Sequence, residues 1–136
     1  MILKLSIKNY ILIEELNVNF KEGFSSITGE TGAGKSIILG ALNLISGARV
    51  DHQIVGPKNE KCIVEGEFLI SESLVDFFNF HDLDFDDHTI LRREILVNGK
   101  SRAFINDSPV KLDTIKSLSE KLINVHSQNH NHILSN

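Results

Sequence analysis

The 136-residue sequence lacks the usual marks of disulfide-bonded, membrane-spanning or secreted proteins. It contains a single cysteine, Cys62, which permits no internal disulfide and is typical of a reducing cytosol. No apolar run approaches the ~20 residues that a membrane-spanning helix needs. At the N-terminus, Lys4 and Lys8 interrupt the apolar residues, so the continuous apolar core of a signal peptide is missing. We therefore expect an intracellular, soluble domain that has no membrane partner.

The sequence also has no excess of positive charge. Fourteen lysines and arginines stand against 18 acidic residues, which gives a formal net charge of −4. A surface built throughout to neutralise nucleic-acid phosphates would be more basic, although a local basic face remains open. The length suits one modest domain, and 41% hydrophobic with 24% charged residues is the composition of an ordinary globular protein.

Alternating apolar and polar residues predict short strands through the first two thirds of the chain. Leu3, Leu5 and Ile7, for example, alternate with polar residues as in a half-buried strand. The dipeptide Asn98-Gly99 is the strongest short hairpin signal, and residues 106–109 predict a second turn. The predicted strands cover residues 3–8, 16–20, 24–28, 62–70, 90–95, 102–105 and 122–125.

A long apolar stretch predicts a central helix over residues 35–46. Its apolar residues leave almost no polar face, so we expect burial on most sides and a C-terminal glycine cap at Gly47. A short helix is expected within residues 71–80. Asp113 or Thr114 is expected to cap a further, amphipathic helix. The pattern as a whole predicts the α/β class, with a mixed β-sheet packed on the central buried helix.

The segment GETGAGKS, residues 29–36, fits the phosphate-loop pattern G-x-x-x-x-G-K-[ST] at every fixed position. It lies between a predicted strand and the central helix, which is the context that this motif requires. A glycine-rich turn with a chance lysine is the alternative interpretation. A dinucleotide-binding G-x-G-x-x-G pattern fails, because its third glycine would fall on Ile37. The candidate phosphate-binding residues are Gly29, Glu30, Thr31, Gly32, Ala33, Gly34, Lys35 and Ser36.

These residues have separate roles in holding a polyphosphate. The glycines allow the main chain to approach the phosphates closely, so that successive amides converge on the anion. The helix N-terminus adds roughly half a positive charge at the same place. Lys35 supplies a mobile point charge for the β- and γ-phosphates, and Ser36 offers its hydroxyl to Mg²⁺. The sequence therefore predicts binding of a nucleotide with Mg²⁺.

Three segments of the sequence resemble the RecN family of bacterial DNA-repair ATPases. This family belongs to the structural-maintenance-of-chromosomes class and has an ATPase head of the ABC type. LSIKNYILIEELNVNF resembles its opening strands, and GFSSITGETGAGKSIILGALNLISGARVD resembles its phosphate loop and following helix. GKSRAFINDSPVKLDTIKSLSEKLINVHSQNHNHIL resembles the segment that leads to its glutamine loop. Where the family typically reads His-Gly-Gln-His-Glu-His, this chain keeps His126 and Gln128 and changes their neighbours.

The resemblance implies that ATP is the nucleotide and that Gln128 contacts Mg²⁺ and the attacking water when two heads close. The apolar run with Asp-Glu and the Ser-Gly-Gly signature of such heads are missing from this sequence. In the family both lie beyond a long coiled coil, so residues 1–136 are expected to be the N-terminal lobe of a split ATPase head, inactive alone. The implied partners are ATP, DNA, the C-terminal lobe and a second head in a homodimer. The implied location is the bacterial cytoplasm, in association with the nucleoid.

Two other functions stay open, namely a complete small P-loop kinase and a non-catalytic nucleotide-binding interaction module.

The sequence also contains several weaker candidate binding sites. Asp82, Asp84 and Asp86 imitate a calcium loop, but the glycine and the bidentate glutamate that it needs are missing. The remaining candidates are Arg49 for the nucleotide or the opposing head, Lys100 and Arg102 for DNA phosphates, and His126, His130 and His132 for zinc.

Overall fold

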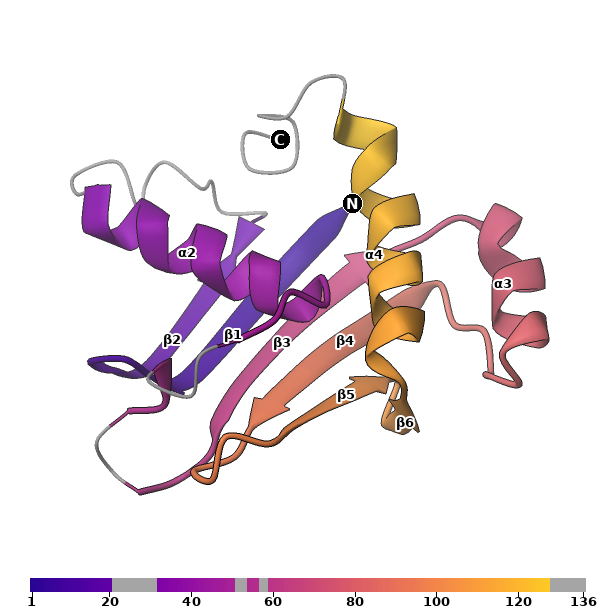
Figure 1. Cartoon of the computed structure of the whole chain (residues 1–136). Coiled ribbons are helices and arrows are strands. Elements are labelled where there is room, and N and C mark those ends of the chain that lie inside the picture. The colour runs from indigo at the N-terminus through magenta and orange to yellow at the C-terminus, as the bar shows by residue number, and fades with distance from the viewer. Residues whose placement is uncertain (21–31, 51–53, 57–58, 128–136) are drawn as a thin grey trace.

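The computed structural model describes residues 1–20, 32–50, 54–56 and 59–127 (Figure 1). In this part of the chain the strands form one six-stranded sheet with the order β2-β1-β3-β4-β5-β6. The strands are β1 (Ile2–Tyr10), β2 (Ile13–Asn19), β3 (Cys62–Leu69), β4 (His88–Ile95), β5 (Ser101–Ile105) and β6 (Ser108–Val110). The helices are α2 (Gly32–Ile45), the 3-10 helix η3 (Glu72–Leu74), α3 (Val75–Phe80) and α4 (Leu112–Ser127). The predicted strand at residues 24–28 lies outside the described residues.

The expected α/β class is confirmed, and every described pair of neighbouring strands is antiparallel. The central hairpin forms where Asn98-Gly99 predicted it. Gly99 has a φ of +91°, and the Leu96 amide donates to the Lys100 carbonyl at 2.7 Å. The second turn is shorter than predicted, because only Asn106 and Asp107 adopt the left-handed φ that a tight turn needs. Ser108 and Pro109 already belong to β6.

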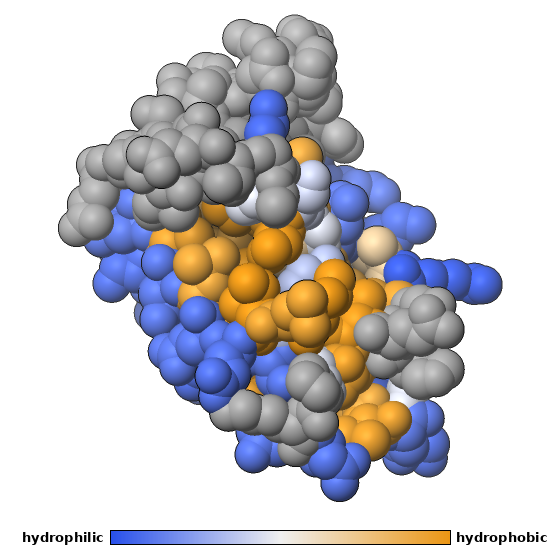
Figure 2. All heavy atoms as spheres, turned by 90° about the vertical axis from the view of Figure 1, so that its left-hand side faces the viewer, coloured by the Kyte–Doolittle hydropathy of each residue, from blue (hydrophilic) through white to orange (hydrophobic). Residues whose placement is uncertain are grey.

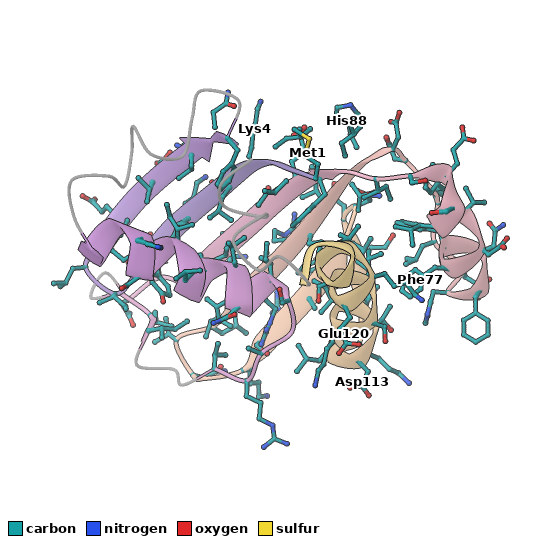
Figure 3. The ribbon with its side chains drawn as sticks, turned by 90° about the horizontal axis from the view of Figure 1, so that it is seen from above. Met1, Lys4, Phe77, His88, Asp113 and Glu120 are labelled. Atoms are coloured by element: carbon teal, nitrogen blue, oxygen red, sulfur yellow. The ribbon has the colours of Figure 1, made fainter. Side chains whose placement is uncertain are left out.

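Helices α2 and α4 lie side by side on one face of the sheet (Figures 1 and 3). Alternation along the strands sends one set of apolar side chains toward the helices, where they form the core. The largest fully buried members of this core are Leu5, Ile7, Ile38, Ile45, Phe78, Leu91, Ile95, Ile105, Ile115 and Leu118. Within the described residues, no helix combines the length and the apolar character that crossing a membrane requires.

Helix α2 is buried along the side that meets the sheet and open on the other side. Ile38, Ala41 and Ile45 are buried, whereas Leu39 is 41% exposed. The buried face of α2 is therefore narrower than the apolar sequence of the helix predicts. The glycine cap is confirmed: Gly47 has a φ of +93°, and the Ala48 amide donates to the Asn43 carbonyl at 3.1 Å. This is the bond of a Schellman motif, in which glycine avoids the strain of a positive φ.

The predicted strand at residues 122–125 is wrong, because α4 runs without interruption to Ser127. Ile115, Leu118 and Leu122 form one buried stripe at helical spacing, and no glycine or proline breaks the pattern. The start of this helix also differs from the prediction. The Lys111 carbonyl accepts the first helical bonds, so Asp113 lies in the first turn rather than at the cap. Its negative charge is favourable there because it faces the positive end of the helix dipole.

Candidate nucleotide-binding site

The second half of the phosphate-loop motif forms the first turn of α2. The helix begins at Gly32, three positions before the predicted start at Lys35. Lys35 and Ser36, which follow the glycines of the motif in the helix, are both exposed. The first amides of a helix have no partner within the helix, and the macrodipole adds roughly half a positive charge at this end. The start of α2 therefore combines a helix N-terminus, a lysine and a hydroxyl, as an anion-binding site requires.

Several predicted site residues lie outside the described part of the chain. These are Gly29, Glu30 and Thr31 in the loop, and Gln128, His130 and His132 near the C-terminus. Their proposed roles stay predictions. The backbone of α4 ends at Ser127, so Gln128 follows directly on a helix that packs beside α2. The fold thus attaches both candidate segments, the phosphate loop and the glutamine segment, to neighbouring helices on one face of the sheet.

Arg49 lies at the opposite end of α2 from the phosphate-loop residues. Fourteen residues form the helix, which corresponds to about 20 Å along its axis. The exposed Arg49 side chain is consequently separated from the helix N-terminus by nearly the whole length of α2. A contact between Arg49 and phosphates bound to the same chain is not supported by this arrangement, which leaves a contact with the opposing head or a solvated surface arginine as the interpretations.

The C-terminal end of α2 is held by a buried arginine from the sheet. Arg93 of β4 is 1% exposed, and its Nη1 donates to the carbonyls of Leu44 and Ala48 at 2.8 and 2.9 Å. Its Nη2 donates to Ser101 Oγ at 3.2 Å. Burial lowers the pKa of the Arg93 guanidinium from its ordinary value, but an arginine starts so far above neutrality that it stays charged.

Helix α4 holds the same end of α2 from a second direction. The Ser119 hydroxyl lies 3.0 Å from the Ser46 carbonyl and 2.9 Å from the Lys116 carbonyl of its own helix, and it shares its one proton between these two acceptors. Close packing supports this bond: a methyl group added at Gly47 would lie 2.8 Å from Lys116 Cβ. The turn that follows α2 is therefore fixed between β4 and α4.

Sequence reasoning did not single out Arg93 or Ser119. A signal for Arg93 was present, since it occupies the same strand face as Leu91 and Ile95 and therefore points into the core. No such signal marks Ser119, because a serine on an amphipathic helix is usually exposed.

The exposed residues Lys100 and Arg102 belong to the β4–β5 hairpin, and Arg102 also lies 3.7 Å from Glu94.

Cys62 can be set aside as a reactive group. It lies fully buried in β3, and burial raises the pKa of its thiol to about 11. The thiol is therefore protonated at neutral pH, whereas nucleophilic and metal-binding cysteines act as thiolates. The candidate calcium-loop residues have a similarly plain explanation: Asp82, Asp84 and Asp86 are exposed, and they alternate with Leu83 and Phe85, which pack against the core.

Comparison with known proteins identifies the family of the chain. Residues 4–136 match the family model described as "AAA domain". The chain belongs to this AAA domain family. It is 40% identical to the DNA repair protein RecN of Vibrio cholerae over 130 residues, which cover 94% of this chain and 24% of that protein. It is 36% identical to DNA repair protein RecN of Bacillus subtilis over 137 residues, covering 98% of this chain and 24% of that protein.

The resemblance to the RecN family that the sequence predicts is therefore confirmed. This AAA domain also shares its fold with a solved structure described as "Structural biochemistry of ATP-driven dimerization and DNA stimulated activation of SMC ATPases". The TM-score is 0.69 at 22% identity, and the match covers 94% of this chain and 83% of that chain. The chain spans about a quarter of the length of the two curated relatives.

Proposed function

We propose that residues 1–136 are the N-terminal lobe of a split, ABC-type ATPase head that binds Mg-ATP at the start of α2. The observation that carries this proposal is the position of the motif. Gly32 and Gly34 lie in the first turn of α2, and Lys35 and Ser36 that follow them are exposed. Residues 29–36 hold the phosphates through their amides, Lys35 neutralises the β- and γ-phosphates, and Ser36 ligates Mg²⁺. The affinity resides mainly in these contacts.

Hydrolysis requires groups that this chain does not supply. Gln128 follows directly on α4, and an amide there suits the positioning of Mg²⁺ and the attacking water, since it accepts and donates at once. The resemblance to the RecN family assigns it that role in a homodimer whose heads enclose ATP. The Asp-Glu pair and the Ser-Gly-Gly signature come from the C-terminal lobe and the second head. We therefore expect the isolated chain to show no ATPase activity above background.

The C-terminal lobe covers apolar surface that this chain leaves open. Figure 2 shows such surface on the side that carries the β1–β2 turn and the start of α2. Ile11 and Leu12 form this turn and are 45% and 87% exposed, and Leu39 on α2 is also open. Apolar side chains that are exposed together on a folded protein commonly mark a surface that another protein segment covers. The matched relatives are about four times as long as this chain, so the rest of such a protein could provide the cover.

The process that this ATPase serves is DNA double-strand break repair and recombination. The support comes from the relatives' name, DNA repair protein RecN, and from identities of 40% and 36% over almost the whole chain. DNA is then a partner of the complete protein rather than of this lobe, whose acidic balance gives no general attraction to phosphates. We place the protein in the bacterial cytoplasm, in association with the nucleoid.

Equilibrium titration of the complete native polypeptide with Mg-ATP tests the proposal. Lys35→Ala removes a charged contact to phosphate and is expected to weaken binding by roughly 10- to 150-fold. The matched control is Lys100→Ala, which removes an exposed lysine from the β4–β5 hairpin and leaves affinity unchanged. A folded Lys35→Ala variant with wild-type affinity would contradict the phosphate-loop assignment. Robust ATPase activity of the 136 residues alone would favour a self-sufficient enzyme such as a small kinase.

A further inference from the structure

The two ends of α2 are one rigid body, so whatever holds the C-terminal end also aims the N-terminal end. At the C-terminal end the planar guanidinium of Arg93 donates to Leu44 O inside the last turn and to Ala48 O beyond the cap. These two acceptors lie on either side of Gly47, where the chain reverses. Both bonds come from Nη1, while Nη2 is held by Ser101, so the planar guanidinium fixes the direction of the turn as well as its position.

The chemistry of Arg93 is poorly suited to a purely packing role. All three oxygens that accept from it, two carbonyls and the Ser101 hydroxyl, are uncharged. A buried charge loses its hydration, and apolar side chains of similar volume often serve a core equally well or better. What offsets the charge here is the end of α2, whose last carbonyls carry roughly half a negative charge. Arg93 is thus matched to this helix end in charge, direction and shape.

The Ser119 bond adds a third attachment from α4. Together, the contacts to Leu44, Ala48 and Ser46 tie the end of α2 to two different elements of the core. Figures 1 and 3 both show this end of α2 beside α4, while the helix start extends away from it. A small rotation at the tied end would therefore displace the helix start by a larger distance.

We propose that Arg93 is a positioning residue for nucleotide binding: it holds the C-terminal end of α2, and thereby aims the amides and Lys35 at the other end toward the phosphates. This inference rests on the proposed function. Arg93 touches neither nucleotide nor metal and acts through the helix alone. In catalysis, misplacement by about 1 Å can cost a hundredfold in rate. The same loss of alignment weakens the contacts between the start of α2 and the phosphates, so loss of the anchor has a measurable effect on affinity.

The test separates aiming from simple stabilisation. Arg93→Met, Arg93→Lys and a control, Phe78→Leu, are made in the complete native polypeptide. Phe78 is a fully buried residue of α3, packed against Phe85 rather than α2. Melting temperature and Mg-ATP affinity are measured for each, the affinity well below the melting temperature. Arg93→Met is expected to weaken Mg-ATP binding roughly 10- to 100-fold, and Phe78→Leu to lower the melting temperature with affinity unchanged.

Arg93→Lys and one further variant, Ser119→Ala, keep the inference testable if Arg93→Met does not fold. Arg93→Lys keeps the charge but loses the planar guanidinium and its second nitrogen, so affinity is expected to recover to within a few-fold of wild type. Ser119→Ala removes only the third attachment and is expected to weaken binding a few-fold. Folded variants at both positions that bind Mg-ATP as tightly as wild type would overturn the inference. If Lys35→Ala also leaves affinity unchanged, it is the proposed function that fails, and with it the role of Arg93.

Discussion

The two ends of α2 differ in almost every physical respect. At the C-terminal end, Arg93 and Ser119 satisfy helix carbonyls, and Gly47 reverses the chain in contact with Lys116. At the N-terminal end, Lys35 and Ser36 are exposed. A fixed end and an open end on one helix allow a ligand to be held by groups that need not move when it binds. This preorganisation reduces the free energy that binding would otherwise spend on ordering.

The largest expected effect concerns catalysis at the open end. Gln128→Ala in the complete native polypeptide is expected to lower kcat by roughly a hundred- to a thousandfold, with ATP affinity changed only a few-fold. The reason is that Gln128 would engage the water and Mg²⁺ chiefly in the transition state. Single-turnover kinetics and equilibrium binding measure the two quantities, and Asn129→Ala is the neighbouring control. A large loss of affinity with kcat intact would mean that Gln128 holds the nucleotide instead.

A second prediction breaks the fixed end at its turn. Gly47→Ala places a methyl group at a φ of +93° and 2.8 Å from Lys116 Cβ. Strain of this kind is expected to lower the free energy of unfolding by about 1–3 kcal/mol. Denaturant unfolding measures the change, and Asn43→Ala, at an exposed position of the same helix, is the control. Equal stability of the two variants would show that the turn adapts and that this end is less rigid than its contacts indicate.

A smaller effect is expected when a single attachment is removed. Ser119→Ala leaves the Ser46 carbonyl without its hydroxyl donor and should cost about 1 kcal/mol of unfolding free energy. Ser117→Ala, on the exposed side of α4, is the matched control and should be neutral. Hydrogen exchange at the amides of residues 46–48 would locate the effect. Faster exchange confined to α4 alone would contradict the contact between the two helices.

The smallest effect on stability is expected on the open side of α2. Leu39→Asn changes a side chain that is already partly exposed, so the unfolding free energy of the 136-residue chain should change by no more than about 0.5 kcal/mol. The same variant should weaken association with a separately supplied C-terminal lobe, measured by co-purification or titration. Ile90→Asn, on an exposed part of the opposite face, is the control. Unchanged association would place the docking surface elsewhere.

Local patterns were sufficient for the elements that depend on neighbouring residues. The hairpin at Asn98-Gly99 and the cap at Gly47 were predicted because glycine there relieves a positive φ, whatever the rest of the chain does. The positions of β1, β3, β4 and β5 followed from the apolar and polar pattern of their segments. The segment at residues 122–125 was misassigned because four apolar-rich residues suit a strand or a buried helix equally well, and only the stripe with Ile115 and Leu118 decides between them.

The sequence by itself predicted the chemistry of the open end, because residues 29–36 are contiguous and their residue types match a phosphate-loop pattern. Only the tertiary structure decided how that end is held. Arg93 is 49 residues from Leu44, and Ser119 is 73 residues from Ser46. Contacts over such separations depend on strand order and on which helices share a face. An arginine in a strand becomes the cap of a helix only after the sheet has brought the two together.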